Sequence, residues 1–347
     1  MVPMRYKLLG DSGLRVSELA LGSMTFGKNE AWGCSKTVAR TIYDTYRAAG
    51  GNLIDTASYF MSGESEACLS DFIAKDRDAV VLTTKCGYGS PSRNPNAAGI
   101  HRKYMLKAVE TSLRRLGTDY IDLLWLNGWD FMTPEHEVMR LLEDLLRMGK
   151  VLYIGITDAP AWIVSRCNTT AELRGWTSFI GLQVQYNLVE RSIEREILPM
   201  ARASDIGVVA CSPLAGGFLT GKYTDGGSKG RLIYDDLNNF KGANHQQVNV
   251  VLEAVAAEAD CQPAQVALAW VRDQNVIPIL GARTCQQIQE NLGVLEVSLT
   301  VQQLEQLNDA SRIDLGYPHE YLCKTRPATY AGMFEKIDRH RDRGGSS

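Results

Sequence analysis

Short apolar segments alternate with amphipathic segments along almost the whole chain. The apolar runs are typical of buried strands, and the segments between them place apolar residues at helical spacing. We predict strands at 19–21, 52–55, 80–84, 121–126, 151–156, 179–184, 207–211 and 276–280. We predict helices at 36–49, 63–73, 101–116, 134–148, 160–167, 193–203, 246–259 with 263–274, and 284–292. Regular alternation implies a parallel sheet, and eight strand–helix units favour a closed (β/α)8 TIM barrel.

Three further features refine this α/β fold. Residues 6–9 and 14–16 flank a glycine-containing turn, which predicts an N-terminal β-hairpin. A doubly wound dinucleotide-binding sheet needs Gly-x-Gly-x-x-Gly after an early strand, and the chain contains none. The stretches 89–100 and 215–242 are rich in loop-forming residues and are expected to be long rim loops. We expect residues 1–347 to form a single domain, with 324–347 as a peripheral C-terminal segment.

Composition excludes several classes of partner. The chain is 45% hydrophobic and 22% charged, with a formal net charge of -3. This charge offers no electrostatic footprint for nucleic acid or an anionic membrane. No apolar run is long enough to span a bilayer, and the start lacks a signal-peptide core, so we expect a cytoplasmic protein. The partner we expect is a small molecule; the oligomeric state stays open.

Polar side chains end three successive predicted strands. Asp55 follows 52–54, Lys85 follows 80–84 and Asn127 follows 121–126. A barrel of this kind builds its active site from the carboxyl ends of its strands, so these three side chains should meet at one rim. Cys86 adjoins Lys85, but a lone thiol needs an activating base to react. We therefore predict a catalytic site around the first three residues.

Two segments late in the chain suit a phosphate group. Arg283 follows a predicted strand, and Thr284 is placed to cap the next helix. A helix N-terminus with an adjacent arginine is a good anion site, although a capped helix with a surface arginine would look the same. Ser212 opens a second, glycine-rich segment, in which Lys222 adds another cation. Together the two segments predict a phosphate site on neighbouring barrel units.

Several motifs resemble the aldo-keto reductase superfamily, in its aryl-alcohol-dehydrogenase-like branch. They are Gly-Leu-Arg-Val-Ser-Glu-Leu-Ala-Leu-Gly at 13–22, Asn-Leu-Ile-Asp-Thr-Ala at 52–57, Arg-Arg-Leu-Gly-Thr-Asp-Tyr-Ile-Asp-Leu at 114–123, Ser-Pro-Leu-x-x-Gly at 212–217 and Gly-Ala-Arg-Thr at 281–284. The resemblance covers nearly the whole chain. It implies a (β/α)8 barrel that binds NADP(H) in an extended form.

The resemblance also implies roles for individual residues in cofactor binding. Arg283 resembles the residue that holds the 2′-phosphate, and Gln287 and Asn291 resemble the adenine contacts. Thr157, Asp158 and Gln183 match positions that hold the nicotinamide carboxamide. Many relatives carry Ser-Asn at 157–158, and an ionised Asp158 can accept but not donate a hydrogen bond. The full set assigned to the cofactor is Thr157, Asp158, Gln183, Ser212, Leu214, Gly216, Lys222, Gly281, Arg283, Gln287 and Asn291.

The catalytic half departs from the family pattern. Family members reduce carbonyls with an Asp, a Tyr, a Lys and a His, in which the Tyr gives a proton to the developing alkoxide. Asp55 and Lys85 match, but Phe60 stands at the Tyr position and Asn127 at the His position. Phenyl has no proton to give, and loss of a general acid costs about 10²–10⁴-fold in rate. Ordinary carbonyl reduction is therefore disfavoured.

Four hypotheses follow for the altered site. Tyr59 replaces the missing donor through a one-residue shift. Alternatively, the enzyme reduces an imine or activated double bond of a secondary metabolite, where no Tyr is needed. A third hypothesis is non-redox elimination or isomerisation with Lys85 as general base, and a fourth is an inactive binding subunit. In every case Asp55 and Lys85 could also be a purely structural ion pair. Phe60, Tyr88 and Trp129 are candidates for the substrate pocket, whereas Trp125 lies mid-strand and is assigned to the core.

Overall fold

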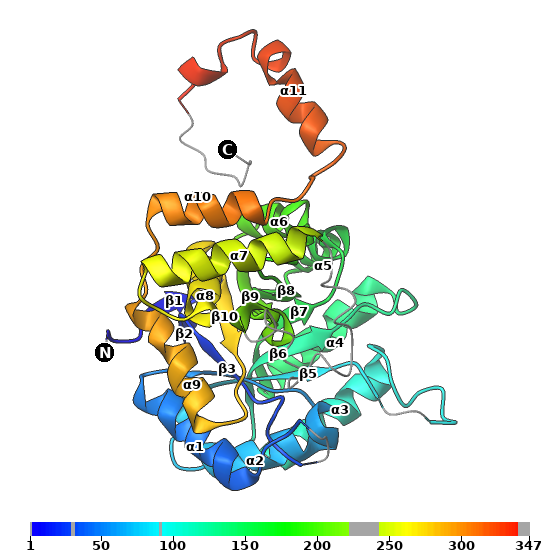
Figure 1. Ribbon diagram of the computed structural model, residues 1–347. Helices are drawn as coiled ribbons and strands as arrows, with labels where there is room; N and C mark the ends of the chain where they lie inside the picture. The colour runs from blue at the N-terminus through cyan, green and yellow to red at the C-terminus, as the bar shows by residue number, and fades with distance from the viewer. Residues whose placement is uncertain (1, 29–31, 90–91, 222–242, 339–347) are drawn as a thin grey trace.

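The protein is a closed barrel of eight parallel strands surrounded by helices (Figure 1). The computed structural model describes residues 2–28, 32–89, 92–221 and 243–338. The barrel strands are β3 (Ala20–Gly22), β4 (Leu53–Asp55), β5 (Val81–Cys86), β6 (Ile121–Asn127), β7 (Val151–Thr157), β8 (Gly181–Gln185), β9 (Gly207–Cys211) and β10 (Ile277–Leu280). Strand β10 pairs with both β9 and β3, which closes the sheet. The predicted fold class is confirmed.

Helices cover the outside of the barrel, as the helical spacing of apolar residues requires. They are α1 (Lys36–Ala48), α2 (Glu64–Ile73), α3 (Arg102–Leu116), α4 (Glu135–Arg147), α5 (Ala161–Arg174), α6 (Ile197–Ala203), α7 (Ala243–Glu258), α8 (Pro263–Asp273), α9 (Cys285–Leu292), α10 (Val301–Ala310) and α11 (His319–Thr329). Helix α5 runs seven residues past its predicted end at 167. Helix α6 is shorter than predicted, because a 3-10 turn occupies 192–194. The sequence interpretation missed α10 and α11.

An N-terminal hairpin closes the bottom of the barrel. Strands β1 (Tyr6–Leu8) and β2 (Arg15–Ser17) pair antiparallel, as predicted. Leu9 and Val16 are fully buried, and they belong to the same cluster as residues that fill the barrel interior. The hairpin therefore seals the end opposite the carboxyl ends of the strands, which leaves only the other end available for ligands.

Trp125 fills the middle of the barrel. Its side chain is 1% exposed and packs in the interior cluster, which confirms that it belongs to the core. Gly155 and Gly181 face the indole from β7 and β8, where a Cβ would collide with the ring. The two glycines make room for the indole, because a close-packed interior has no space for both this ring and side chains at positions 155 and 181.

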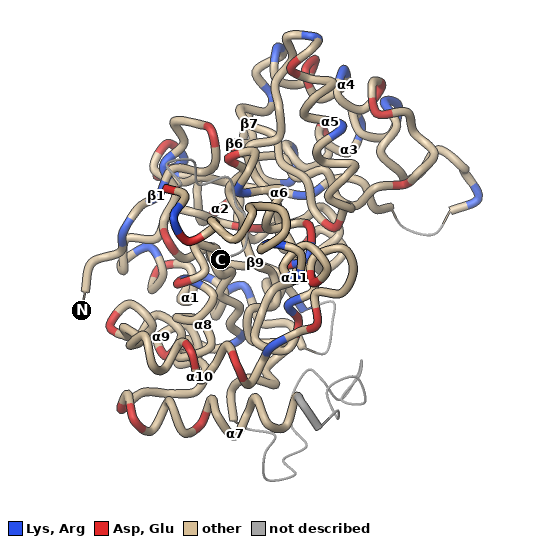
Figure 2. Tube along the Cα trace, turned by 90° about the horizontal axis from the view of Figure 1, so that it is seen from above, with Lys and Arg blue, Asp and Glu red and all other residues tan. Residues whose placement is uncertain are grey.

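The outer surface carries interspersed charges of both signs. Figure 2 shows acidic and basic positions mixed along the outer helices and loops. None of the described helices is long and apolar enough to cross a membrane.

The C-terminal part leaves the barrel wall after Ser311. Helix α11 has no buried residues and projects away from the barrel in Figure 1. Polar contacts tie the start of this segment to α6 and the turn before it: Arg195 donates to the Asp314 carbonyl at 2.8 Å, and His319 lies 3.2 Å from Glu196. Of the segment 324–347, residues 339–347 fall outside the described residues.

Gly155→Ala tests the packing around Trp125. The added Cβ would lie 2.8 Å from the Gly181 carbonyl oxygen and closer still to the indole. Overpacking of this kind typically costs about 1–3 kcal/mol, so we expect the free energy of unfolding to fall by that amount in urea denaturation. Gly13→Ala is the control, because its Cβ meets nothing within 4 Å. Equal stability of the two variants would contradict this packing arrangement.

Candidate active site

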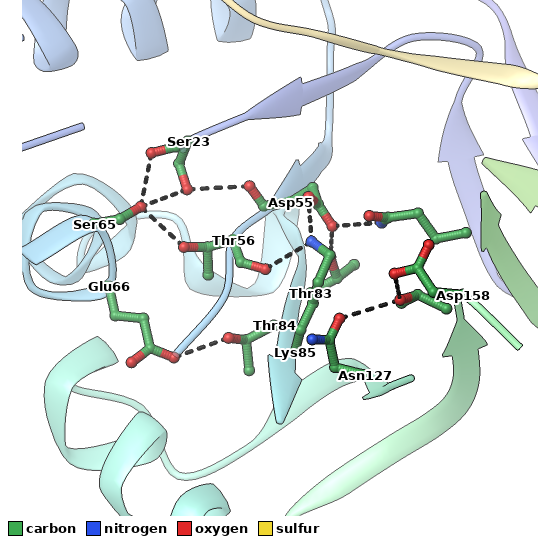
Figure 3. Close-up of polar contacts among 12 residues, drawn as sticks. Ser23, Asp55, Thr56, Ser65, Glu66, Thr83, Thr84, Lys85, Asn127 and Asp158 are labelled. Atoms are coloured by element: carbon green, nitrogen blue, oxygen red, sulfur yellow. Dashed lines mark hydrogen bonds and ion pairs between the residues drawn. The ribbon is translucent and has the colours of Figure 1, made fainter. Parts of the chain in front are cut away.

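Asp55 and Lys85 form a buried ion pair at the carboxyl ends of β4 and β5. Lys85 Nζ lies 2.5 Å from Asp55 Oδ2 and 3.0 Å from the Thr56 carbonyl oxygen. Both residues are 4% exposed. The other carboxylate oxygen, Oδ1, accepts hydrogen bonds from Gln183 Nε2 at 2.8 Å and from Thr83 Oγ1 at 3.1 Å. Figure 3 shows these contacts converging on the Asp55 carboxylate.

Phe60 covers the ammonium group instead of bonding to it. Its ring centroid lies 5.0 Å from Lys85 Nζ, at a distance suited to a cation–π contact. Phe60 opens the 3-10 helix η1 (Phe60–Gly63), in which Met61 and Ser62 have φ of 49° and 56°. Because these two residues have left-handed backbone angles, the chain turns sharply after Phe60. The backbone of this turn sets the direction of the Phe60 ring. The aromatic contact stabilises the charge of Lys85 but supplies no transferable proton.

A second buried network holds the segment 56–63 against the barrel. Glu66 is fully buried and accepts a hydrogen bond from Thr84 Oγ1 at 2.8 Å. Arg115 pairs with Glu66 at 3.3 Å and donates to the Ser58 carbonyl at 2.8 Å. These contacts fix the backbone on which Tyr59 and Phe60 are carried.

Tyr59 does not replace the missing tyrosine in this structure. Its side chain is 41% exposed, and its ring packs against Phe60 at 5.1 Å and Tyr88 at 5.5 Å between centroids. Among the residues that the structure describes, no hydrogen bond links Tyr59 to Lys85. Burial raises the pKa of the Tyr59 phenol, and the charges of Asp55 and Asp158 raise it further. The phenol is thus a poorer acid than free tyrosine, and the one-residue shift gains no support.

Asn127 joins a polar chain that runs to Asp158. It ends β6 and is 2% exposed, beside Thr157 at the end of β7. The Thr157 hydroxyl lies 3.1 Å from Asn127 Oδ1 and 2.5 Å from Asp158 Oδ2. Asp158 itself has a left-handed φ of 52°. Asn127 Nδ2 is buried, and a side-chain hydrogen bond between Asn127 and Tyr59 partly offsets the rise in the pKa of the Tyr59 phenol.

A cavity of about 540 Å³ extends from the ion pair across the rim. Its volume is within the range of small-molecule sites. Asp55, Phe60 and Gln183 line one end. The predicted cofactor residues that line it are Gln183, Ser212, Leu214, Gly216, Gly281, Arg283, Gln287 and Asn291. The structure thus brings together residues that are more than 200 positions apart in the chain.

Other predicted site residues lie elsewhere. The predicted site residues that are not among the described residues lining the cavity are Tyr59, Lys85, Tyr88, Asn127, Trp129, Thr157 and Asp158. Lys222 falls outside the described residues. Trp129 is half-buried and packs against the outer core cluster, so its assignment to the substrate pocket lacks support. Tyr88 is half exposed and stacks on Tyr59.

The cavity also has lining residues that the sequence interpretation did not single out. Met24, Thr25 and Trp32 come from the loop after β3, and Gln262 and Leu268 come from the start of α8 and its interior. No local sequence motif marks the contacts of these three loop residues. The residues near α8 are brought to the cavity only by the closure of the barrel.

The far end of the cavity suits a phosphate group. Thr284 caps α9 by accepting from the Gln287 backbone N–H at 3.2 Å, and the Arg283 backbone N–H donates to Gln287 Oε1 at 2.8 Å. Asn291 Nδ2 donates to the Gly281 carbonyl at 3.1 Å. A Cβ built on Gly281 would meet nothing within 4 Å, so the backbone there is open to a ligand. Guanidinium and helix N-terminus together fit the phosphate of an adenine dinucleotide.

Cys86 has no chemical role in this arrangement. The thiol is fully buried, and burial raises its pKa to about 12. The thiol lies 3.9 Å from Ser112 Oγ, which makes at most a weak hydrogen bond. A thiol that stays protonated at neutral pH is not a nucleophile.

Comparison with known proteins identifies the family. The model of the aldo/keto reductase family matches residues 18–312. A norsolorinic acid reductase of Aspergillus flavus is 33% identical over 335 residues, covering 93% of this chain and 85% of the relative. Norsolorinic acid reductase B of Aspergillus parasiticus is 37% identical over 338 residues, covering 92% and 87%. An aryl-alcohol dehydrogenase of Pestalotiopsis microspora is 35% identical over 331 residues, covering 92% and 85%.

The chain belongs to the aldo/keto reductase family. Members are oxidoreductases that act on small molecules with a nicotinamide cofactor, as the resemblance of the motifs had implied.

Asp55→Asn tests the ion pair. The substitution leaves the Lys85 charge buried without a counter-ion, and removal of one partner of such a pair typically costs about 3–5 kcal/mol. We expect the free energy of unfolding to fall by that amount in guanidinium denaturation. The control is Asp71→Asn, which breaks the exposed pair between Asp71 and Lys36 and should change stability little. A similarly small decrease in the free energy of unfolding of both variants would show that Asp55 is not needed as the counter-ion of Lys85.

Proposed function

We propose that the protein binds NADP(H) along the rim cavity and transfers hydride between this cofactor and an organic metabolite of small or middle size, without the usual tyrosine–histidine pair. The observation that carries the proposal is the continuous cavity. It joins the Asp55 end to Arg283 and the N-terminus of α9. A long groove with a phosphate-suited end and a reactive end matches an extended dinucleotide.

The choice of NADP(H) over NAD(H) rests on Arg283. Its planar guanidinium can pair bidentately with a 2′-phosphate, which a ribose hydroxyl cannot offer. The positive φ of Ser212 at 50° and of Gly216 at 64° lets the backbone after β9 approach a bound ligand closely. Bound cofactor supplies the hydride; Gln183 and Asp55 lie at the end of the cavity where the nicotinamide is expected.

The altered residues define the kind of substrate. Phe60 has no proton to donate, and the amide of Asn127 does not transfer one at neutral pH. We therefore expect fast reduction only where hydride addition needs no enzymatic acid, as in an activated double bond or an imine. Carbonyl reduction should be slower by about 10²–10⁴-fold than with a positioned acid. The names of the relatives suggest an aromatic metabolite.

Non-redox chemistry with Lys85 as general base is the alternative. A base must reach its substrate, but Lys85 Nζ is bonded to the Asp55 carboxylate and the Thr56 carbonyl, lies under the Phe60 ring, and is not among the described residues that line the cavity. We therefore favour the redox proposal. Strict one-to-one NADPH oxidation with product supports it, whereas turnover without cofactor consumption supports the alternative. Absence of both NADPH oxidation and cofactor-independent turnover would favour a binding subunit.

Arg283→Met tests the cofactor assignment. Loss of a charge-assisted contact should weaken NADPH binding by about tenfold to a hundredfold, equivalent to about 1.5–3 kcal/mol. NADH binding should change much less, because it lacks the 2′-phosphate. Fluorescence titration of each reduced cofactor measures both constants. Arg174→Met, an exposed site at the end of α5, is the matched control; an equal loss for NADH and NADPH would argue against a 2′-phosphate contact.

Phe60→Tyr combined with Asn127→His tests the cause of the altered chemistry. The double variant restores a phenol beside Lys85 and an imidazole at the end of β6. We expect NADPH-dependent reduction of 4-nitrobenzaldehyde to rise by about 10²-fold or more. Phe60→Leu should show no such rise. If the double variant folds and binds NADPH but gains nothing, the missing acid is not what limits carbonyl reduction.

A further inference from the structure

Three successive residues after Phe60 have left-handed backbone angles. Met61 and Ser62 have φ of 49° and 56°, and Gly63 has φ of 94°. Residues with a Cβ adopt this conformation at a cost, and such strain persists only where surrounding contacts hold it. Phe60 lies immediately before this turn, lines the cavity and has its ring centroid 5.0 Å from Lys85 Nζ. The position of the ring therefore depends on what holds the turn.

Arg115, on α3, contacts the chain on both sides of this left-handed turn. Its Nη1 donates to the Ser58 carbonyl at 2.8 Å, ahead of the turn, and lies 3.3 Å from Glu66 Oε2, behind it. A Cβ built on Gly63 would collide with the guanidinium group, so this group packs directly against the backbone of the turn. One planar cation thus joins the segments that enter and leave the turn.

The two anchors of Arg115 are themselves fixed to the barrel. The Ser58 N–H donates to the Lys85 carbonyl at 3.1 Å. Glu66 is fully buried and accepts from Thr84 Oγ1 at 2.8 Å (Figure 3). Both partners belong to β5. Arg115 therefore ties the turn to the strand whose ammonium group lies under the aromatic ring.

Packing alone does not fix the turn in this way. Cβ atoms built on Gly27 and Gly33 would meet Met61 at 3.0 Å and 2.9 Å, so the buried Met61 side chain fills the space beside these glycines. Van der Waals contact of this kind has no preferred direction. The hydrogen bond from Arg115 does, and it holds the Ser58 peptide in one orientation.

We propose that Arg115 is a positioning residue, which holds the left-handed turn and thereby keeps the Phe60 ring over Lys85 at the reactive end of the cavity. Arg115 is not among the described residues that line the cavity, and it acts through the backbone of the turn. The consequence for substrate binding rests on the proposed function, in which Phe60 is part of the wall that an aromatic substrate contacts. The placement of the ring does not rest on it.

Nuclear magnetic resonance tests the placement of the ring. Protons above an aromatic face are shielded, so the Cε protons of Lys85 should resonate upfield of those of other lysines in the full-length protein labelled with 13Cε-lysine. Lys85→Arg identifies the signal, and Phe60→Leu defines the upfield shift that the ring causes. No cofactor or turnover is needed, so a failure here is distinct from a failure of the proposed function.

Arg115→Met combined with Glu66→Gln removes the clamp without leaving a buried charge unpaired. Loss of Arg115 alone would leave Glu66 without its counter-ion and would destabilise the whole protein. Glu66→Gln alone is the control, because glutamine still accepts from Thr84 and Arg115 keeps its bond to Ser58. We expect the control to keep the upfield signal and the double variant to lose most of the shift. A full shift in the double variant, or an equal loss in the control, would overturn the proposal.

Ser62→Gly separates positioning from a general loss of packing. Ser62 is exposed, and glycine adopts its φ of 56° without the cost of a Cβ. Added to the double variant, Ser62→Gly should restore most of the upfield shift, because a turn with less strain needs less clamping. A general packing defect at Arg115 would not be repaired from this site. A shift that is not restored would therefore contradict the role given to the turn.

Binding of an aromatic ligand tests the consequence for the cavity. The probe is 4-nitrobenzaldehyde, titrated into each protein with saturating NADP+, so that no hydride is available. Loss of one aromatic contact in the double variant should weaken its binding by about threefold to tenfold, whereas binding of NADP+ should change by less than about twofold. Unchanged aldehyde binding despite a lost upfield shift would contradict the part that Phe60 is given in substrate binding. No binding to the wild-type protein would count against the proposed function instead.

Discussion

The buried ion pair between Asp55 and Lys85 constrains the whole active end of the barrel. Two opposite charges at 4% exposure are tolerable only when each is paired and hydrogen-bonded. Gln183 and Thr83 donate hydrogen bonds to the second carboxylate oxygen of Asp55. These bonds hold the ends of strands β4, β5 and β8 in one arrangement. Removing either charge would leave the other buried without a counter-ion. The pair is thus expected to persist whatever happens to the residues around it, and its presence alone does not define the chemistry.

On the proposed function, the residues around this pair alter proton transfer while the cofactor groove is kept. At the position where the family pattern has a tyrosine, Phe60 places its ring face over the ammonium group of Lys85. At the position where that pattern has a histidine, Asn127 belongs to a chain of polar groups reaching Asp158. Phe60 lines one end of the cavity, whereas Arg283 lines the other. The proposal therefore separates cofactor binding from proton transfer, so that one can change without the other.

The sequence predicted the architecture well because the signals are periodic and local. The positions of Asp55, Lys85 and Asn127 at or next to the ends of their strands follow from apolar runs, and the hairpin follows from its turn residues. The helices α10 and α11 were missed because they come after the eight repeats that the pattern completes. The turn that directs the Phe60 ring depends on two left-handed residues, Met61 and Ser62, which no propensity favours. The bond between Asn127 and Thr157 depends on the register of β6 against β7, which a single sequence does not specify.

Transfer of isotope from the cofactor tests the central claim most directly. Cinnamaldehyde offers both a carbonyl and an activated double bond, and NADPH doubly deuterated at C4 of the nicotinamide labels whichever carbon receives the hydride. The account predicts that mass spectrometry and NMR will find deuterium in the product, mainly at C3 of the saturated aldehyde, since addition there requires no enzymatic acid. Consumption of cinnamaldehyde with no deuterium in the product would contradict a hydride-transfer enzyme, and label mainly at C1 would contradict the role given to Phe60.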